Sequence, residues 1–232
     1  MAPLIVIRPE PGCSATVALA LAARLEAEGF PLFEVVPVSW QAPLATGYDA
    51  LLAGSANVFR HGGPGLAALR GLPVLAVGDA TAEAACEAGF TVSHSGKGGL
   101  QALLQELDAT PRRLLRLAGE ERIVLQPPLG TTIEDRVVYA SRPIAAPQAL
   151  LQRLREPAVI ALHSAEAARH LAAQCAAHGL RRSPLRLAAL GPRIAAAAGD
   201  GWGEVAVAGQ TSDQALLALA RQMCQDPGPK GR

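Results

Sequence analysis

The chain has 232 residues, of which half are apolar and 18% are charged, and its formal net charge is +1. This length accommodates two small domains with separate cores, and the near-zero charge argues against a protein that neutralises many phosphates of a nucleic acid or a membrane surface. The cysteines lack metal-ligand spacing, and no basic n-region or membrane-length apolar stretch is present, so we expect a cytoplasmic protein that acts on a small molecule.

Short apolar runs alternate with helical patterns along the chain. Residues 4–7 predict a buried strand, and residues 14–28 predict a helix that stops at Gly29. Further strands are predicted at 51–53, 73–77, 114–117, 159–162, 185–190 and 204–208, and further helices at 79–88, 164–178, 192–198 and 212–224. This alternation predicts parallel sheets with helices on both faces.

Two extended segments, 32–38 and 132–141, interrupt the alternation. They are β-branched and have no helix in phase behind them, so we interpret them as connectors. The predicted organisation is a first domain of 1–36 plus 142–226, an inserted second domain of 40–130, and connecting strands at 31–39 and 131–141. The tail, 227–232, is rich in Pro and Gly and is predicted to be disordered.

The two halves of the chain repeat one pattern. Residues 48–56 resemble 157–165, and residues 76–90 resemble 189–202, at separations of roughly 110 residues. A duplicated pattern of this length predicts two similar domains, which commonly bind a ligand between them.

Motifs in both halves resemble the uroporphyrinogen-III synthase family. The matching segments lie at 5–12, 48–57, 77–82, 137–139, 163–165, 205–208 and 213–217. The resemblance implies an α/β protein of two flavodoxin-like parallel-sheet domains joined by a two-stranded linker. It implies a lyase of haem biosynthesis that closes hydroxymethylbilane to uroporphyrinogen III, with loss of water and inversion of ring D through a spiro intermediate.

The resemblance also implies the partners of the protein. The substrate is the small molecule hydroxymethylbilane, which hydroxymethylbilane synthase would hand over transiently. The resemblance implies no cofactor and no metal, and the near-zero net charge argues against a nucleic acid or a membrane as partner.

Candidate carboxylate-binding residues stand where a strand turns into a helix, since helix N-termini offer free N–H groups to anions. They are Ser55, Ala56, Gly78, Ser164, Ala165 and Gly191. For the two serines, ordinary N-capping is favoured over ligand contact. For the two glycines, a tight turn and a close approach of the ligand to the backbone are compatible interpretations.

Three other positions bear on substrate binding. Arg8 follows the first strand, where a two-pronged contact with a carboxylate and a surface ion pair are equally favoured. Thr81 lies in the first turn of its helix, and a bond to its own backbone is favoured over a ligand contact. Ile194 stands where the family often has threonine, so a hydroxyl there is lost or was never required.

Tyr139 is the candidate catalytic residue, because it matches the family position proposed to assist departure of the substrate hydroxyl. A phenol keeps its proton at neutral pH and can donate it, or a hydrogen bond, to a leaving oxygen. A half-buried strand tyrosine without a chemical role is the alternative, and it is the preferred one when the resemblance is set aside.

Two other classes of protein compete with the enzyme interpretation. A two-lobed small-molecule sensor would share the strand ends, but it would ordinarily have an export signal or an output domain. A nucleotide-dependent transferase would need an intact phosphate loop, and residues 96–99 supply only a fragment of one. His61, His94 and His163 show no metal-ligand spacing and are interpreted as structural or solvated.

Overall fold

The computed structural model describes residues 2–107, 110 and 112–226, and it separates into two compact units. Unit 1 comprises Met1–Glu34 and Pro143–Arg232, and unit 2 comprises Val35–Arg142. The tail that the sequence predicts to be disordered lies outside the described residues. Within the described part of the chain, no helix combines the length and apolar character needed to cross a membrane.

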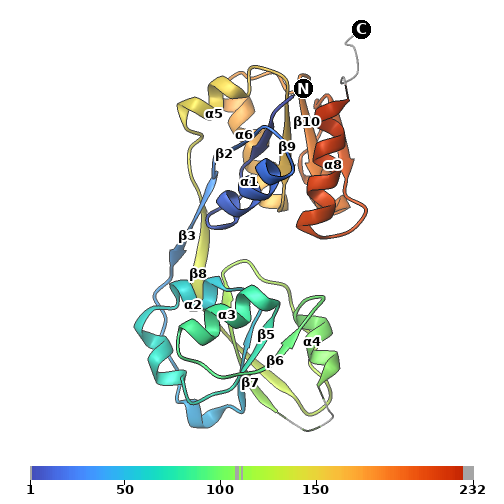
Figure 1. The fold of residues 1–232 in the computed structure, drawn as a ribbon. Coiled ribbons are helices and arrows are strands. Elements are labelled where there is room, and N and C mark those ends of the chain that lie inside the picture. The colour runs from blue at the N-terminus through green and yellow to red at the C-terminus, as the bar shows by residue number, and fades with distance from the viewer. Residues whose placement is uncertain (1, 108–109, 111, 227–232) are drawn as a thin grey trace. The chain divides into compact units, whose positions relative to one another are not determined.

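Unit 1 is built on a five-stranded parallel sheet (Figure 1). Its order is β11-β10-β9-β1-β2. Residues 4–6 pair with 159–161 on one side and with 27–29 on the other, so β1 is internal and buried throughout. The strands are β1 (Leu4–Val6), β2 (Ala27–Gly29), β9 (Ala158–Leu162), β10 (Leu185–Ala189) and β11 (Glu204–Val207).

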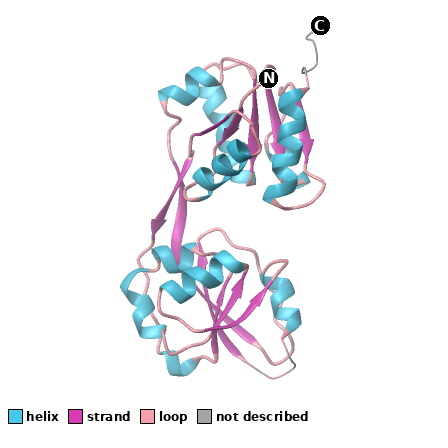
Figure 2. Cartoon of the chain, viewed as in Figure 1, coloured by secondary structure: helices cyan, strands magenta, loops and turns pink. Residues whose placement is uncertain are grey.

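Helices cover both faces of this sheet (Figure 2). Its three central strands, β1, β9 and β10, are therefore buried on both sides. One apolar layer joins the sheet to α1 (Gly12–Ala22) and α8 (Asp213–Gln225). The other joins it to α5 (Gln148–Arg153), α6 (Ala165–Ala177) and α7 (Pro192–Ala197).

Unit 2 contains a six-stranded mixed sheet of order β3-β8-β7-β4-β5-β6. Strands β4 to β8 pair in parallel. The parallel strands β8-β7-β4-β5-β6 of unit 2 correspond in spatial order to β2-β1-β9-β10-β11 of unit 1. The first of these strands along the chain is β1, the second in this order, in unit 1, but β4, the third in this order, in unit 2. The strands are β3 (Phe33–Pro37), β4 (Ala50–Ala53), β5 (Val74–Val77), β6 (Val92–Gly96), β7 (Arg113–Gly119) and β8 (Thr132–Pro143).

The helices of unit 2 also form two layers. An apolar layer on one face unites the sheet with α2 (Asn57–His61), the 3-10 helix η2 (Gly63–Leu69) and α3 (Asp79–Glu87), and α4 (Leu100–Glu106) packs in the layer on the other face. A short 3-10 helix, η1 (Ala45–Gly47), precedes β4. The connection from β7 to β8 has no helix, so the segment 120–131 passes from one parallel strand to the next as a loop.

The predicted α/β class with two flavodoxin-like sheets is confirmed, and both predicted connectors form strands, β3 and β8. The sequence did not predict β6 or the helices α2, α4 and α5. β6 is an edge strand whose central residues are polar and exposed, so it lacks the apolar signal of the inner strands.

The helix predicted over 14–28 is wrong at its C-terminal half. α1 ends at Ala22, and residues 27–29 form β2. Arg24 adopts a left-handed conformation with φ +60, and the Leu25 N–H donates to the Ala20 carbonyl at 3.0 Å, which closes the helix without a glycine. Gly29 does not end the helix. It allows close packing of β2 against α1, because a Cβ there would lie 2.8 Å from the Cys13 Sγ.

Arg24→Gly is expected to stabilise the protein by about 0.5–1 kcal/mol, since glycine adopts a positive φ without the steric penalty that other residues carry. Urea unfolding of wild type, Arg24→Gly and Arg24→Ala measures the difference. The alanine variant is the control, because it removes the side chain and keeps the strained conformation. A glycine variant no more stable than the alanine variant would contradict this account.

Candidate functional site

The predicted site residues of unit 2 gather at the carboxyl edge of its sheet. Ser55 follows β4 and Gly78 follows β5, and β7 ends at Gly119. Because the neighbouring strands are parallel, these three strand ends lie at one edge of the sheet.

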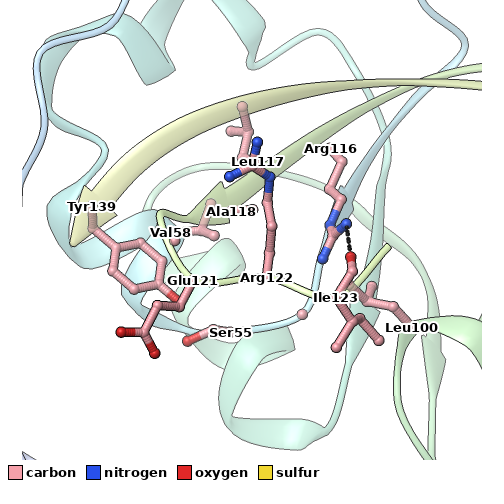
Figure 3. Close-up of a pocket in the computed structure, with 12 residues that line it drawn as sticks. Ser55, Val58, Leu100, Arg116, Leu117, Ala118, Glu121, Arg122, Ile123 and Tyr139 are labelled. Carbon is pink, nitrogen blue, oxygen red and sulfur yellow. Dashed lines mark hydrogen bonds between the residues drawn. The ribbon is translucent and has the colours of Figure 1, made fainter. Parts of the chain in front are cut away.

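A cavity of about 210 Å³ opens at this edge (Figure 3). The wall is formed by residues 116–119 of β7, by loop residues that follow β4 and β7, by one residue each of α2 and α4, and by Tyr139 of β8. The lining residues are Gly54, Ser55, Val58, Leu100, Arg116, Leu117, Ala118, Gly119, Glu121, Arg122, Ile123 and Tyr139. Hydroxyl, guanidinium and carboxylate groups therefore share the cavity with apolar side chains.

Gly119 fixes the position of the Tyr139 ring. The two residues are paired across β7 and β8 where the register shifts, and the Glu120 N–H donates to the Tyr139 carbonyl at 3.0 Å. A Cβ on Gly119 would lie 2.8 Å from the Tyr139 Cζ and 3.0 Å from its hydroxyl oxygen. The phenol end of the ring thus occupies the space that a side chain on residue 119 would fill, and Tyr139 contributes to the cavity wall.

Ser55 both lines the cavity and supports its own turn, since its Oγ accepts a hydrogen bond from the Asn57 N–H at 3.2 Å. Ala56 is buried in the apolar layer that contains α2 and α3. Gly78 has φ +79, which confirms the predicted tight turn into α3. Thr81 lies in that helix with only 5% exposed, and it is not a lining residue of the cavity.

The predicted residues of unit 1 lie at the carboxyl edge of the other sheet. Ser164 caps α6, because its Oγ accepts from the Ala167 N–H at 3.1 Å, and Ala165 is the first residue of that helix. The capping interpretation of Ser164 is therefore confirmed. Gly191 precedes α7 in an extended conformation, φ −165, which any residue can adopt, so the backbone of this turn does not need a glycine. Ile194 packs partly buried against the apolar layer.

Arg8 forms an ion pair with Asp213, the first residue of α8. The Arg8 Nη1 donates to the Asp213 Oδ2 at 2.9 Å, and it also lies 3.4 Å from the Thr16 Oγ1. The side chains are 30% and 44% exposed, so the pair contributes little to stability by itself. A partly exposed guanidinium remains available to an anion at this edge.

His163 is buried beside that ion pair. Its Nε2 lies 3.6 Å from the Asp213 Oδ1, and neither ring nitrogen has a hydrogen-bond partner among the described residues. Burial, together with the positive charge of Arg8, lowers the pKa of His163 from 6.5 to about 4, and Asp213 opposes that shift. His163 is therefore neutral at physiological pH, as its structural interpretation requires.

Sequence reasoning missed four residues that shape the two edges. Asp213 and Gly119 position Arg8 and Tyr139, and Arg116 and Arg122 line the cavity. Arg116 carries a detectable signal, because it is a charged residue inside the apolar strand 114–117. Among the described residues, no group of three or more His, Cys, Asp or Glu side chains is placed to hold a metal ion.

Comparisons with known proteins agree on one family. A family model described as uroporphyrinogen-III synthase HemD matches residues 14–218. The uroporphyrinogen-III synthetase structure from Helicobacter pylori 26695 superposes with a TM-score of 0.63 at 16% identity, covering 96% of this chain and 100% of that one. A mutant uroporphyrinogen III synthase from the extremely thermophilic bacterium Thermus thermophilus gives 0.51 at 19% identity, covering 97% and 100%. No curated protein matches the sequence.

The buried His163 is expected to make the protein less stable in mild acid. Since its folded pKa of about 4 lies below the ordinary 6.5, the unfolded chain binds more protons between these values, and the free energy of unfolding falls as pH decreases through this window. The loss from pH 7 to pH 5 is on the order of 2 kcal/mol.

Urea unfolding at pH 7 and pH 5 measures this loss in wild type and in His163→Phe, which removes the titrating group. His178→Gln, at an exposed histidine, is the control and should retain the wild-type difference. A His163→Phe variant with the same pH dependence as wild type would remove His163 as the cause.

Proposed function

The chain belongs to the uroporphyrinogen-III synthase family, and from this premise we propose that the carboxyl edges of its two sheets bind the substrate and that the unit 2 cavity holds the reacting end. Enzymes of this family are lyases of haem biosynthesis, which close hydroxymethylbilane to uroporphyrinogen III with inversion of ring D. Because the chain belongs to this family, we no longer interpret it as a sensor or as a nucleotide-dependent transferase.

The reaction depends more on control of where the ring closes than on strong acid or base catalysis. Hydroxymethylbilane loses its hydroxyl readily to give an azafulvene cation, which closes head to tail to the type I ring when nothing directs it. An enzyme must instead bring the azafulvene carbon to the substituted position of ring D, which forms the spiro intermediate. Binding and orientation therefore supply most of the required effect.

The Tyr139 phenol at the cavity wall is the observation that carries the proposal. Tyr139 donates a hydrogen bond or proton to the departing hydroxyl, and the apolar part of the cavity wall, Val58 with Leu117, limits access of water to the cation. Gly119 is a positioning residue, because it permits the ring to lie against β7.

The substrate carries eight carboxylates, and the two sheet edges offer matching donors. In unit 2, the N-terminal turns of α2 and α3, which follow Ser55–Ala56 and Gly78, bring backbone N–H groups to the edge of the sheet, although the Gly78 N–H itself donates to the Gly96 carbonyl at 3.0 Å. Thr81 lies in the first turn of α3. In unit 1, the turn at Ser164–Ala165 and the Gly191 turn do the same. Arg8 adds a partly exposed guanidinium, which a substrate carboxylate approaches on the side away from Asp213.

The cellular setting is also part of the proposal. We place the protein in the cytoplasm, where hydroxymethylbilane synthase hands over its unstable product transiently. The net charge of +1 fits a partner of this kind better than a nucleic acid or a membrane surface.

Tyr139→Phe is expected to lower kcat on the order of tenfold and to leave the product as type III, because the hydroxyl departs readily and the cavity still directs closure. The assay supplies freshly made hydroxymethylbilane and separates the oxidised products into uroporphyrin I and III. Tyr48→Phe removes the hydroxyl of the second tyrosine, which bonds Glu134 at 2.6 Å and does not line the cavity, and should keep the wild-type kcat. Equal rates for Tyr139→Phe and wild type would exclude the proposed role.

Gly119→Ala is expected to lower kcat by at least as much as Tyr139→Phe, since the added methyl displaces the ring. Gly71→Ala is the matched control in the same unit, because a Cβ there meets no atom within 4 Å. Circular dichroism and thermal unfolding check that both variants fold. A Gly119→Ala enzyme with wild-type kcat would show that the position of the ring does not matter.

A further inference from the structure

Arg116 occupies a core position of β7 although it carries a charge. Leu114, two residues earlier, packs in the layer that contains α4, whereas Leu115 and Leu117 belong to the opposite layer. Alternation along the strand places Arg116 on the α4 side, and only 4% of the residue is exposed. An apolar side chain would ordinarily stand at such a position.

The charge of Arg116 is incompletely compensated. Its Nη1 donates to the Ile123 carbonyl at 2.9 Å and lies 3.7 Å from the Asp135 Oδ2. That same oxygen accepts from the Arg122 Nε at 2.8 Å, so two guanidinium groups share one carboxylate. The Arg116 Nε is buried without a hydrogen-bond partner among the described residues.

This arrangement is costly unless a further anion joins it. Burial lowers the pKa of Arg116, and the attraction of Asp135 opposes that shift. A buried charge without full pairing destabilises a folded protein, and replacement by an apolar side chain is often neutral or stabilising. Packing alone therefore does not explain an arginine here.

Arg116 borders the cavity at the carboxyl edge of the unit 2 sheet. Arg122, Ser55 and Tyr139 line the same cavity. Glu121 also lines the cavity, but Figure 3 shows its carboxylate and the Arg116 guanidinium on opposite sides of the set of lining residues. The Glu120 carboxylate beside the loop is already paired with Arg142.

We propose that Arg116 is a specificity-determining residue of unit 2, whose guanidinium pairs with one carboxylate of the tetrapyrrole when an acetate or propionate side chain enters this cavity. The inference rests on the proposed function, since it assumes that the cavity receives the substrate. The added carboxylate gives Arg116 a second counter-charge beside Asp135, which it shares with Arg122. It also fixes one pyrrole ring relative to Tyr139, which lies in the same cavity wall.

Arg116→Met tests the proposal, because methionine preserves much of the volume and removes the charge. We expect KM for hydroxymethylbilane and the inhibition constant of uroporphyrinogen III to rise together by about 10- to 100-fold, the usual effect of losing one charge-assisted contact. We expect kcat to change less than about threefold and the thermal unfolding midpoint to stay or rise. Arg116→Lys, which keeps the charge, should restore most of the affinity.

Arg186→Met is the matched control. Arg186 is another buried strand arginine, 6% exposed, but it belongs to unit 1 and donates to the Asp226 carbonyl at 3.2 Å. It lies 3.9 Å from Glu204. This variant should keep the wild-type KM, and Arg116→Gln replaces Arg116→Met in the comparison if the latter does not fold.

Folded Arg116→Met with KM and inhibition constant within twofold of wild type would overturn the proposal. So would equal losses of affinity in Arg116→Met and Arg186→Met, since these would assign the effect to structure. The proposed role of the cavity in the reaction fails separately, when Tyr139→Phe and Gly119→Ala turn over like wild type. Slow Tyr139→Phe combined with unchanged KM in Arg116→Met contradicts only the inference about Arg116.

Discussion

Parallel pairing positions the candidate functional residues of this chain, because it brings the ends of neighbouring strands to one edge. In unit 1 the pairing of β1 with β9, and of β9 with β10, sets Arg8, Ser164 and Gly191 at neighbouring strand ends. In unit 2 the pairing of β4 with β5 and β7 does the same for Ser55, Gly78 and Gly119. Backbone hydrogen bonds thus place donors that are far apart in sequence, and buried apolar strands hold that placement.

The two units use one sheet order with different entry points. β1 of unit 1 and β7 of unit 2 occupy equivalent positions in their sheets. The C-terminal end of each strand therefore lies at the carboxyl edge of its own sheet. Unit 1 places an ion pair between Arg8 and Asp213 there, beside a buried neutral histidine. Unit 2 places a glycine there, and this opens the space that the Tyr139 ring occupies. A duplicated framework has therefore acquired two different chemical environments through a few side chains.

One local energetic cost lies beside the cavity of unit 2. Arg116 and Arg122 share Asp135, and a loop instead of a helix connects β7 to β8. Ile123 of that loop is 55% exposed, yet its carbonyl accepts a hydrogen bond from the Arg116 Nη1 at 2.9 Å. Features that weaken a fold commonly lie where a protein binds or reacts. The free energy gained by burying the apolar layers on both faces of the sheet offsets such a cost.

The sequence by itself determined the class of fold, the duplication and the strand-to-helix turns, because apolar periodicity and capping residues are local signals. Ser164 and Gly78 are examples, since a cap and a positive φ depend on the nearest few residues. Tertiary structure alone decided the end of α1, where Arg24 takes the conformation expected of a glycine and Gly29 packs against Cys13. It likewise decided the pairing of Arg8 with Asp213 and the seating of Tyr139 on Gly119, because each depends on strands and helices meeting across long stretches of chain. Such contacts have no periodicity in the sequence, so only the folded chain reveals them.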